Sequence, residues 1–388
     1  MKRVILWGIP ALILLGAGFF FFVLAGIVEG QMNQVRQAPP YTVSERASAL
    51  HKTLTVADLH ADSLLFGRDL NAKATRGQVD VPRLIEGNVA VQIFAVVSKT
   101  PKSMNIENNT GDTDNITTIA IANRWPVETW TSLKARALYQ ASQLKQFAAA
   151  SEGRLVIVET KRDLADFLEK RKSNPNMVAG ILALEGAQVL EGDPTNVGPI
   201  FDAGYRMMAP THFFDNEMAG SAHGVEKAGL TEAGREMIRL MEARKMIVDI
   251  AHGSVAQIDD VLDMATRPVV VSHTGVKGTC DNNRNLSDDQ LRKIAAKGGL
   301  VGIGFWDTAT CGTDAAATAR AQKYVADLIG VQHVGNGSDF DGAVTTPFDA
   351  SGMAVLTEAL IETGLSDADI GAVMGGNQVR FLMENLPD

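Results

Sequence analysis

Short apolar, β-branched runs recur eight times from residue 53 onward, each followed by polar or Gly residues and then by a longer helix-compatible stretch. The runs are continuous rather than alternating, which is typical of parallel strands buried on both faces. Eight such strands alternating with helices predict an α/β fold, the (β/α)8 TIM barrel. An open doubly wound sheet is the alternative, but no Gly-x-Gly-x-x-Gly motif follows the first run. The expected strands are Thr55–Leu59, Val89–Val97, Val178–Leu184, Tyr205–Ala209, Met246–Ile250, Pro268–Ser272, Leu300–Phe305 and Gln332–Gly335.

The N-terminal segment, residues 4–28, holds 25 residues without a charged side chain and follows Lys2 and Arg3. As a helix it would span about 37 Å, enough to cross a bilayer core of about 30 Å. We therefore expect residues 1–28 to be a transmembrane anchor or uncleaved signal in the lipid bilayer, with cleavage near Ala25 as the alternative. The two basic residues predict a cytoplasmic N-terminus. The chain would then be a single-pass protein of the cell (inner) membrane, with its catalytic domain on the periplasmic or extracellular side.

The rest of the chain divides into a connecting segment and one large domain. Residues 29–52 contain Pro39-Pro40 and predict a tether and a lead-in helix. Residues 53–388 are the predicted barrel, with an insertion at about 98–152. We expect this insertion to form a wall or lid over the functional site of the barrel. Within the insertion we expect a helix over Ala120–Ala150, broken at Pro126, and after it a minor extra strand at Leu155–Val158.

The composition excludes several classes of protein. The chain has 36 Lys and Arg against 45 Asp and Glu, a formal charge of −9. We therefore expect no nucleic-acid partner, because binding phosphates requires a basic face. Two cysteines are too few for a disulfide scaffold or a four-Cys zinc module.

Acidic and His side chains follow six of the predicted strands, and four of the seven His are among them. Active sites of such barrels form at the C-terminal ends of the strands. Any one of these side chains could be structural, but their convergence at one end of the barrel predicts a metal site. They are His60 and Asp62 after the first strand, Glu185 after the third, His212 after the fourth, His252 after the fifth, His273 after the sixth and Asp339 after the eighth.

Neutral imidazole and carboxylate are ligands suited to Zn²⁺. His60 and Asp62 share one face of a strand and can chelate one ion. His252 and His273 can hold a second ion, with Glu185 bridging the pair. Two ions about 3.5–4 Å apart can share a hydroxide and polarise a carbonyl.

At these residues the sequence resembles the membrane dipeptidase family (renal-dipeptidase-like, peptidase M19) of the amidohydrolase superfamily, whose fold is a TIM barrel of the metal-dependent hydrolase type. The resemblance runs from about Val56 to the C-terminus. It rests on the motifs Asp58-x-His60-x-Asp62, Glu185-Gly186, Thr211-His212, Asp249-Ile250-Ala251-His252, Ser272-His273, Arg284-Asn285-Leu286-Ser287-Asp288-Asp289 and Gly337-Ser338-Asp339-Phe340-Asp341-Gly342.

The resemblance implies a zinc-dependent dipeptidase that holds two Zn²⁺ ions bridged by Glu185 and that acts on dipeptides, L-Xaa-D-Xaa dipeptides among them. It implies that Arg284 binds the substrate's C-terminal carboxylate. His212 would contact the substrate carbonyl and the developing oxyanion. Asp339 would be the proton shuttle, because amide hydrolysis needs a proton delivered to the leaving amine, and Asp341 would be structural.

The resemblance further implies a homodimer and a disulfide between Cys280 and Cys311, for which two free thiols are the alternative. Three other functions stay open. One is a different amidohydrolase reaction on the same barrel, such as lactone, acyl-amino acid or β-lactam hydrolysis. The others are an enzyme with a single metal ion and a non-catalytic anchored binding protein.

Overall fold

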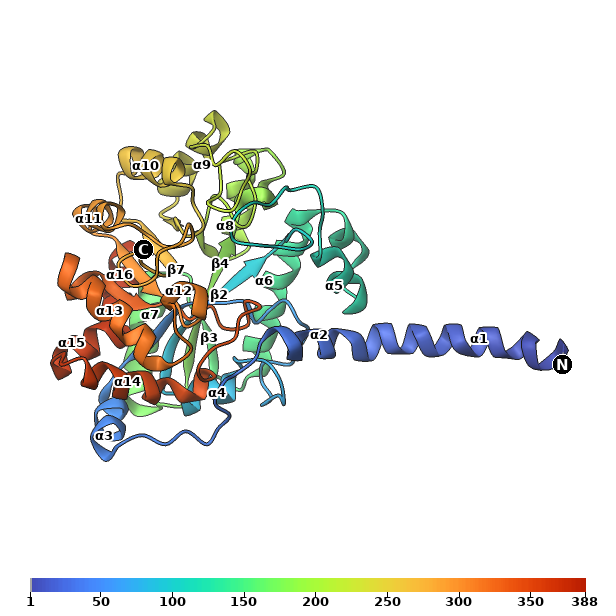
Figure 1. Ribbon diagram of the computed structural model, residues 1–388, viewed down its shortest axis with the longest axis horizontal. Helices are drawn as coiled ribbons and strands as arrows, with labels where there is room; N and C mark the ends of the chain where they lie inside the picture. The colour runs from blue at the N-terminus through green and yellow to red at the C-terminus, as the bar shows by residue number, and fades with distance from the viewer. Residues whose placement is uncertain (1) are drawn as a thin grey trace.

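The fold is described by a computed structural model over residues 2–388 (Figure 1). A strand lies in each of the eight predicted runs, and a ninth, β3, lies at the predicted minor extra strand. The strands are β1 (Val56–Ala61), β2 (Val89–Val97), β3 (Leu155–Ile157), β4 (Val178–Glu185), β5 (Tyr205–Met208), β6 (Ile247–Val248), β7 (Val270–Thr274), β8 (Leu300–Ile303) and β9 (Val334–Asn336).

The strands form two sheets in which every ladder is parallel. The first has the order β1-β2-β4-β5-β6, with β3 also paired to β4, and the second has the order β7-β8-β9. Single parallel bridges join Asp249 to Val270 and Ala61 to Phe340, so both edges of one sheet meet the other. The chain therefore has an α/β fold with a curved parallel sheet, consistent with the predicted barrel.

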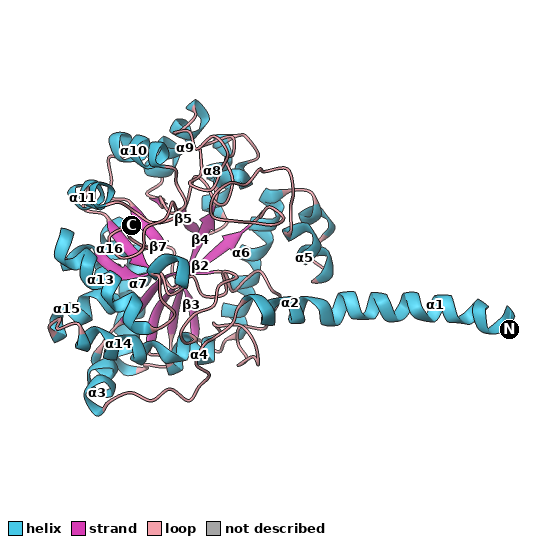
Figure 2. Cartoon of the chain, viewed as in Figure 1, coloured by secondary structure: helices cyan, strands magenta, loops and turns pink. Residues whose placement is uncertain are grey.

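The helices surround the strands (Figure 2), and every residue of β1, β2 and β4 is buried. This burial on both faces explains why the residues of these strands are mainly apolar. The helices are α1 (Lys2–Phe19), α2 (Ala25–Met32), α3 (Glu45–Thr53), α4 (Val81–Glu86), α5 (Ile116–Ala122), α6 (Leu133–Ala150), α7 (Lys161–Ser173), α8 (Val197–Asp202), α9 (Glu232–Ala243), α10 (Val255–Met264), α11 (Asp288–Ala296), α12 (Asp307–Thr310), α13 (Ala315–Ile329), α14 (Met353–Glu362), α15 (Asp367–Gly371) and α16 (Asn377–Asn385).

Side-chain caps set where several of these helices begin. The Ser287 hydroxyl accepts from the Gln290 backbone N–H, and the Gln290 side chain accepts from the Ser287 backbone N–H, which is a complete capping box. The Thr231 hydroxyl accepts from the backbone N–H of Gly234 at the start of α9. These caps fix where the chain turns into α11 and α9.

The N-terminal helix is continuous through α1, a π-helical turn at Phe20–Leu24 (η1) and α2. Its part from Ile9 to Met32 is long and apolar enough to cross a membrane, by length and composition. Leu12, Leu14 and Leu15 are each at least 70% exposed, and the helix projects away from the barrel (Figure 1). At η1 it lies against α5.

The predicted insertion holds two helices separated by a short 3₁₀ turn at Val127–Trp130. The break near Pro126 is present, but α5 already begins at Ile116, before the predicted start at Ala120. This earlier start buries Ile116 and Ala120 in a small apolar cluster with Leu65, Phe66 and Trp125. That cluster lies beside the site described next, so the insertion forms part of its wall.

Candidate metal centre and substrate cavity

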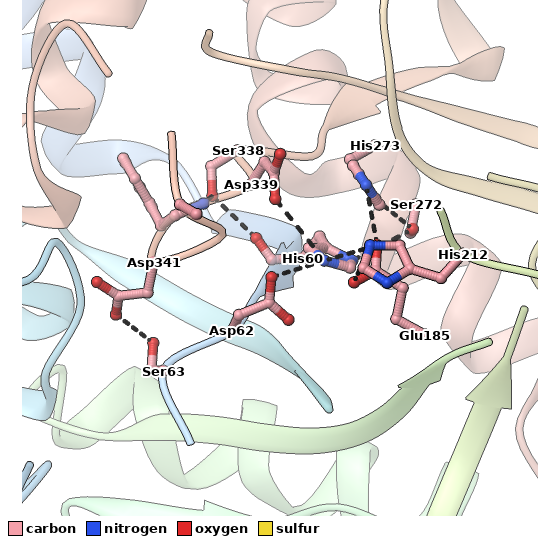
Figure 3. Close-up of polar contacts among 12 residues, drawn as sticks. His60, Asp62, Ser63, Glu185, His212, Ser272, His273, Ser338, Asp339 and Asp341 are labelled. Carbon is pink, nitrogen blue, oxygen red and sulfur yellow. Dashed lines mark hydrogen bonds and ion pairs between the residues drawn. The ribbon is translucent and has the colours of Figure 1, made fainter. Parts of the chain in front are cut away.

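All seven predicted metal-site and catalytic side chains meet at the carboxyl ends of the strands. Figure 3 labels all of them except His252. Glu185, at the end of β4, lies at their centre. Its Oε1 is 2.9 Å from His252 Nε2, 3.3 Å from His273 Nε2 and 3.7 Å from His60 Nε2. Its Oε2 is 3.2 Å from His212 Nε2. Strands far apart in the sequence thus bring four imidazoles to one carboxylate.

Two acidic side chains complete this cluster on the β1 and β9 side. His60 Nε2 is 3.5 Å from Asp62 Oδ2 and 3.9 Å from Asp339 Oδ1. Asp62 lies directly after β1, and Asp339 lies in the loop after β9. The backbones of Asp339 and His252 both have a φ of 61°, in the left-handed region that non-glycine residues rarely adopt. Such strain is typical of functional sites, where the surrounding structure imposes it.

The donor atoms fit a metal pair. Three groups of side chains each bring their ligand atoms within 4.8 Å of one another. His60 Nε2 and Asp62 Oδ1 are buried without a hydrogen-bond partner, which is costly unless something else binds them. The Nε2 atoms of His252 and His273 face each other at 2.9 Å. The groups are His60, Glu185 and His273; Glu185, His212 and His252; and His60, Asp62 and Asp339.

His212 and Asp339 belong to these groups as well. The geometry therefore places His212 and Asp339 within reach of a metal ion, whereas the family resemblance implies that His212 contacts the substrate and that Asp339 transfers a proton. The His212 ring packs edge-to-face against the rings of Phe213 and His252. The His212 backbone carbonyl accepts a hydrogen bond from the Ser221 hydroxyl. These contacts hold the His212 ring next to Glu185.

The electrostatics of the cluster follow from its burial. Burial opposes the protonation of His60, but the charges of Asp62 and Glu185 raise its pKa to about 10. Burial lowers the pKa of His252 and of His273 well below the usual value, and Arg284 or His60 nearby adds to the effect. Burial raises the pKa of Asp339 to about 8. Two of the imidazoles are therefore neutral, which is the form that binds a metal.

Arg284, in the loop after β7, is buried beside this cluster. Its Nη2 donates to the His273 carbonyl at 2.8 Å, and its guanidinium lies 5.7 Å from the centre of the Trp306 ring. It lines the same cavity as Glu185 and Asp339. The loop that carries it is held to the loop after β8 by a disulfide between Cys280 and Cys311.

Asp341 lies outside the metal cluster and organises the loop that carries Asp339. Its carboxylate accepts from the Ser63 hydroxyl at 2.7 Å, from Arg68 Nη2 at 2.5 Å and from the Gln78 backbone N–H at 2.6 Å. These bonds tie the loop after β9 to the segment after β1. They fit the structural role predicted for Asp341.

The cluster opens into a cavity of about 660 Å³, which lies within the range of about 300–1,000 Å³ typical of small-molecule sites. Its walls include residues that the sequence did not single out. Val28 and Met32 come from the N-terminal helix, and Ile106, Ile116 and Ile119 come from the insertion. The apolar pattern of these residues equally suits a core or a membrane, so no sequence signal marks them as part of a site.

His223 is a further residue near the site that the strand-end pattern misses, because it lies in the loop between β5 and α9. Its ring stacks on Phe213, with centres 4.5 Å apart, and its Nδ1 is 2.7 Å from the carbonyl oxygen of Ile106. Asn283 Nδ2 donates to the same carbonyl. Ile106 is thus held from two loops, so the insertion is a fixed wall at this point.

A barrel-like parallel sheet with a His- and carboxylate-lined centre at the strand ends is the arrangement expected of a metal-dependent enzyme. The model of the membrane dipeptidase family (peptidase family M19) matches residues 44–386. The chain therefore belongs to this family.

Named relatives agree with that assignment. A dipeptidase from Aspergillus oryzae is 33% identical over 229 residues, which cover 56% of this chain and 54% of that protein. An uncharacterized dipeptidase from Schizosaccharomyces pombe is 28% identical over 318 residues, 78% of this chain and 72% of that one. This chain thus spans about half the length of the first relative and about three quarters of the second.

Solved structures share the fold. A metallopeptidase from Rhodobacter sphaeroides, liganded with a phosphinate mimic of L-Ala-D-Ala, aligns with a TM-score of 0.70 at 24% identity over 86% of this chain and 99% of that chain. A dipeptidase of peptidase family M19 aligns with a TM-score of 0.71 at 24% identity over 87% of this chain and all of the other. At this identity the two alignments establish the fold.

Proposed function

We propose that this chain is a membrane-anchored dipeptidase with a closed (β/α)8 barrel and a pair of zinc ions. The observation that carries the proposal is the convergence of four imidazoles, those of His60, His212, His252 and His273, on Glu185, with Arg284 in the same cavity. His60 and Asp62 would hold one ion and His252 and His273 the other. When bound, the metal pair supplies Lewis acidity for the peptide carbonyl and lowers the pKa of the attacking water.

The remaining residues bind the substrate and move the proton. Arg284 offers a planar guanidinium to the C-terminal carboxylate, which it can bind in bidentate fashion. His212 donates to the peptide oxygen as negative charge develops on it. Asp339, 3.9 Å from His60, takes a proton from the attacking water and delivers it to the leaving amine. The apolar N-terminal helix supports anchoring in the inner membrane with the barrel outside, and we retain the homodimer as part of the proposal.

The test is a panel of L,L and L,D dipeptides given to purified full-length protein, with and without added Zn²⁺. Asp339→Asn should lower kcat by about 10²- to 10⁴-fold, the usual contribution of a general acid–base. Glu169→Gln, an exposed carboxylate on α7, is the matched control and should leave kcat unchanged. Absence of hydrolysis across the whole panel refutes the proposal.

A further inference from the structure

The substrate cavity has one apolar side that the metal centre and Arg284 do not use. This side is built by three segments that are distant in the sequence: the end of the N-terminal helix, the loop after β1 and helix α5 of the insertion. Its residues are Val28, Met32, Leu65, Phe66, Ile116 and Ile119.

The end of the N-terminal helix is fixed to the barrel at this side. Glu29 is fully buried, and its two carboxylate oxygens pair with Arg68 and with Arg76, the latter at 2.5 Å. Arg68 also pairs with Asp341, which lies in the same loop as Asp339. Asn33 Oδ1 accepts from the Ala343 backbone N–H at 2.8 Å. Because these contacts bracket Met32, the helix presents its apolar residues to the cavity in one position.

The apolar side lies across the cavity from Arg284. Arg284 follows β7, whereas α5 follows β2, and β4, β5 and β6 separate these two strands in the sheet order. The metal-site cluster around Glu185 lies between them at the end of β4. A dipeptide with its carboxylate on Arg284 and its peptide bond at the cluster therefore extends its N-terminal residue toward α5. The N-terminal helix packs on α5 through η1, and Val28 and Met32 line the same cavity as Ile116 and Ile119 of α5.

We propose that the N-terminal helix is a specificity element: Val28 and Met32, with α5 and the loop after β1, form an apolar subsite for the side chain of the N-terminal residue. The proposal rests on the proposed dipeptidase function and adds to it a substrate class, dipeptides with a bulky apolar N-terminal residue. Burial of a large apolar side chain stabilises a bound substrate, and one methylene in such a pocket changes kcat/KM by about 10- to 200-fold.

The test compares kcat/KM for Phe-Ala and Gly-Ala, which differ only in the N-terminal side chain. The wild-type protein should prefer Phe-Ala, and the double variant Val28→Ser/Met32→Ser should lower the Phe-Ala to Gly-Ala ratio about tenfold. Ile27→Ser is the control: Ile27 lies on the same helix, is 44% exposed and does not line the cavity. It should leave the ratio unchanged. A ratio in the double variant within twofold of wild type overturns the subsite.

Calorimetric titration with phosphinate analogues of the same two dipeptides separates this inference from the proposed function. A wild-type preference for the Phe-Ala analogue that the double variant loses supports the subsite. If that preference is found in protein that hydrolyses no dipeptide, the dipeptidase proposal fails and the subsite stands. Equal affinity for both analogues in protein that does hydrolyse dipeptides overturns the subsite alone.

Discussion

Glu29 of the N-terminal helix and Arg68 of the segment after β1 form an ion pair whose two side chains are almost completely buried, the first 0% and the second 1% exposed. This pair joins an apolar helix to the loop system of the metal centre, because Arg68 also pairs with Asp341. The helix end is therefore part of the folded barrel as well as a connection to whatever lies before it.

Loss of Glu29 should destabilise the fold. Glu29→Ala leaves Arg68 and Arg76 without their shared partner, and breaking a buried pair in this way costs about 3–5 kcal/mol. The control is Glu86→Ala, since Glu86 pairs with Lys73 at the surface with both side chains more than 40% exposed; it should cost at most about 1 kcal/mol. Scanning calorimetry of the full-length protein in detergent micelles measures both. Equal melting temperatures for the two variants would contradict the structural role of the pair.

Arg284 should determine whether a free carboxylate is required. Arg284→Ala should lower kcat/KM for a dipeptide by about 10- to 100-fold, the loss expected for a charge-assisted hydrogen bond. It should have little effect on the corresponding dipeptide amide, which carries no carboxylate. The two substrates are compared in the same assay. An equal loss on both would favour another amidohydrolase reaction over dipeptide hydrolysis.

The number of zinc ions bound per chain should depend on the predicted ligand residues. Protein purified without chelator should contain two zinc ions per chain by mass spectrometry, and chelation should abolish activity and lower the melting temperature, because a metal that binds only the folded state stabilises it. His273→Gln should reduce the stoichiometry toward one. His333→Gln, which alters a His whose ring contacts the Gly299 carbonyl outside the centre, should leave it at two. A wild-type stoichiometry near one would support the single-metal alternative.

His51 should make stability depend on pH far from the metal centre. Its ring is held between the Gly87 carbonyl at 3.0 Å and the Thr357 hydroxyl at 2.8 Å, and burial lowers its pKa below 6.5. Below pH 6.5 the unfolded chain therefore binds more protons at this position than the folded chain, so stability falls as the pH falls. The melting temperature of wild type should drop more between pH 7.5 and pH 5.0 than that of His51→Gln. An identical drop in both proteins would refute the assignment.

The sequence predicts the strands well because their burial on both faces leaves continuous apolar runs. It also predicts which residues meet, since the carboxyl ends of parallel strands lie together: His60, Glu185 and His273 are far apart in the chain but converge. The predicted run Met246–Ile250 shortens to Ile247–Val248 in β6, because only two residues there pair with β5.

Long-range pairings leave no local signal in the sequence. The residues next to Glu29 in the sequence do not indicate that its partner is Arg68. The residues next to Val28 and Met32 do not show whether these two side chains face a membrane or line a cavity. The start of α5 at Ile116 depends in the same way on contacts with Leu65 and Phe66, which lie in a different segment.

The carbonyl of Ile106 contacts both the His223 ring and the Asn283 side chain. Neither contact involves a predicted metal ligand, so this part of the wall has hydrogen bonds of its own. Substitutions in the polar part of the insertion can therefore reshape the entrance without moving the imidazoles and carboxylates. Substrate range and bond-breaking chemistry can diverge independently on this scaffold.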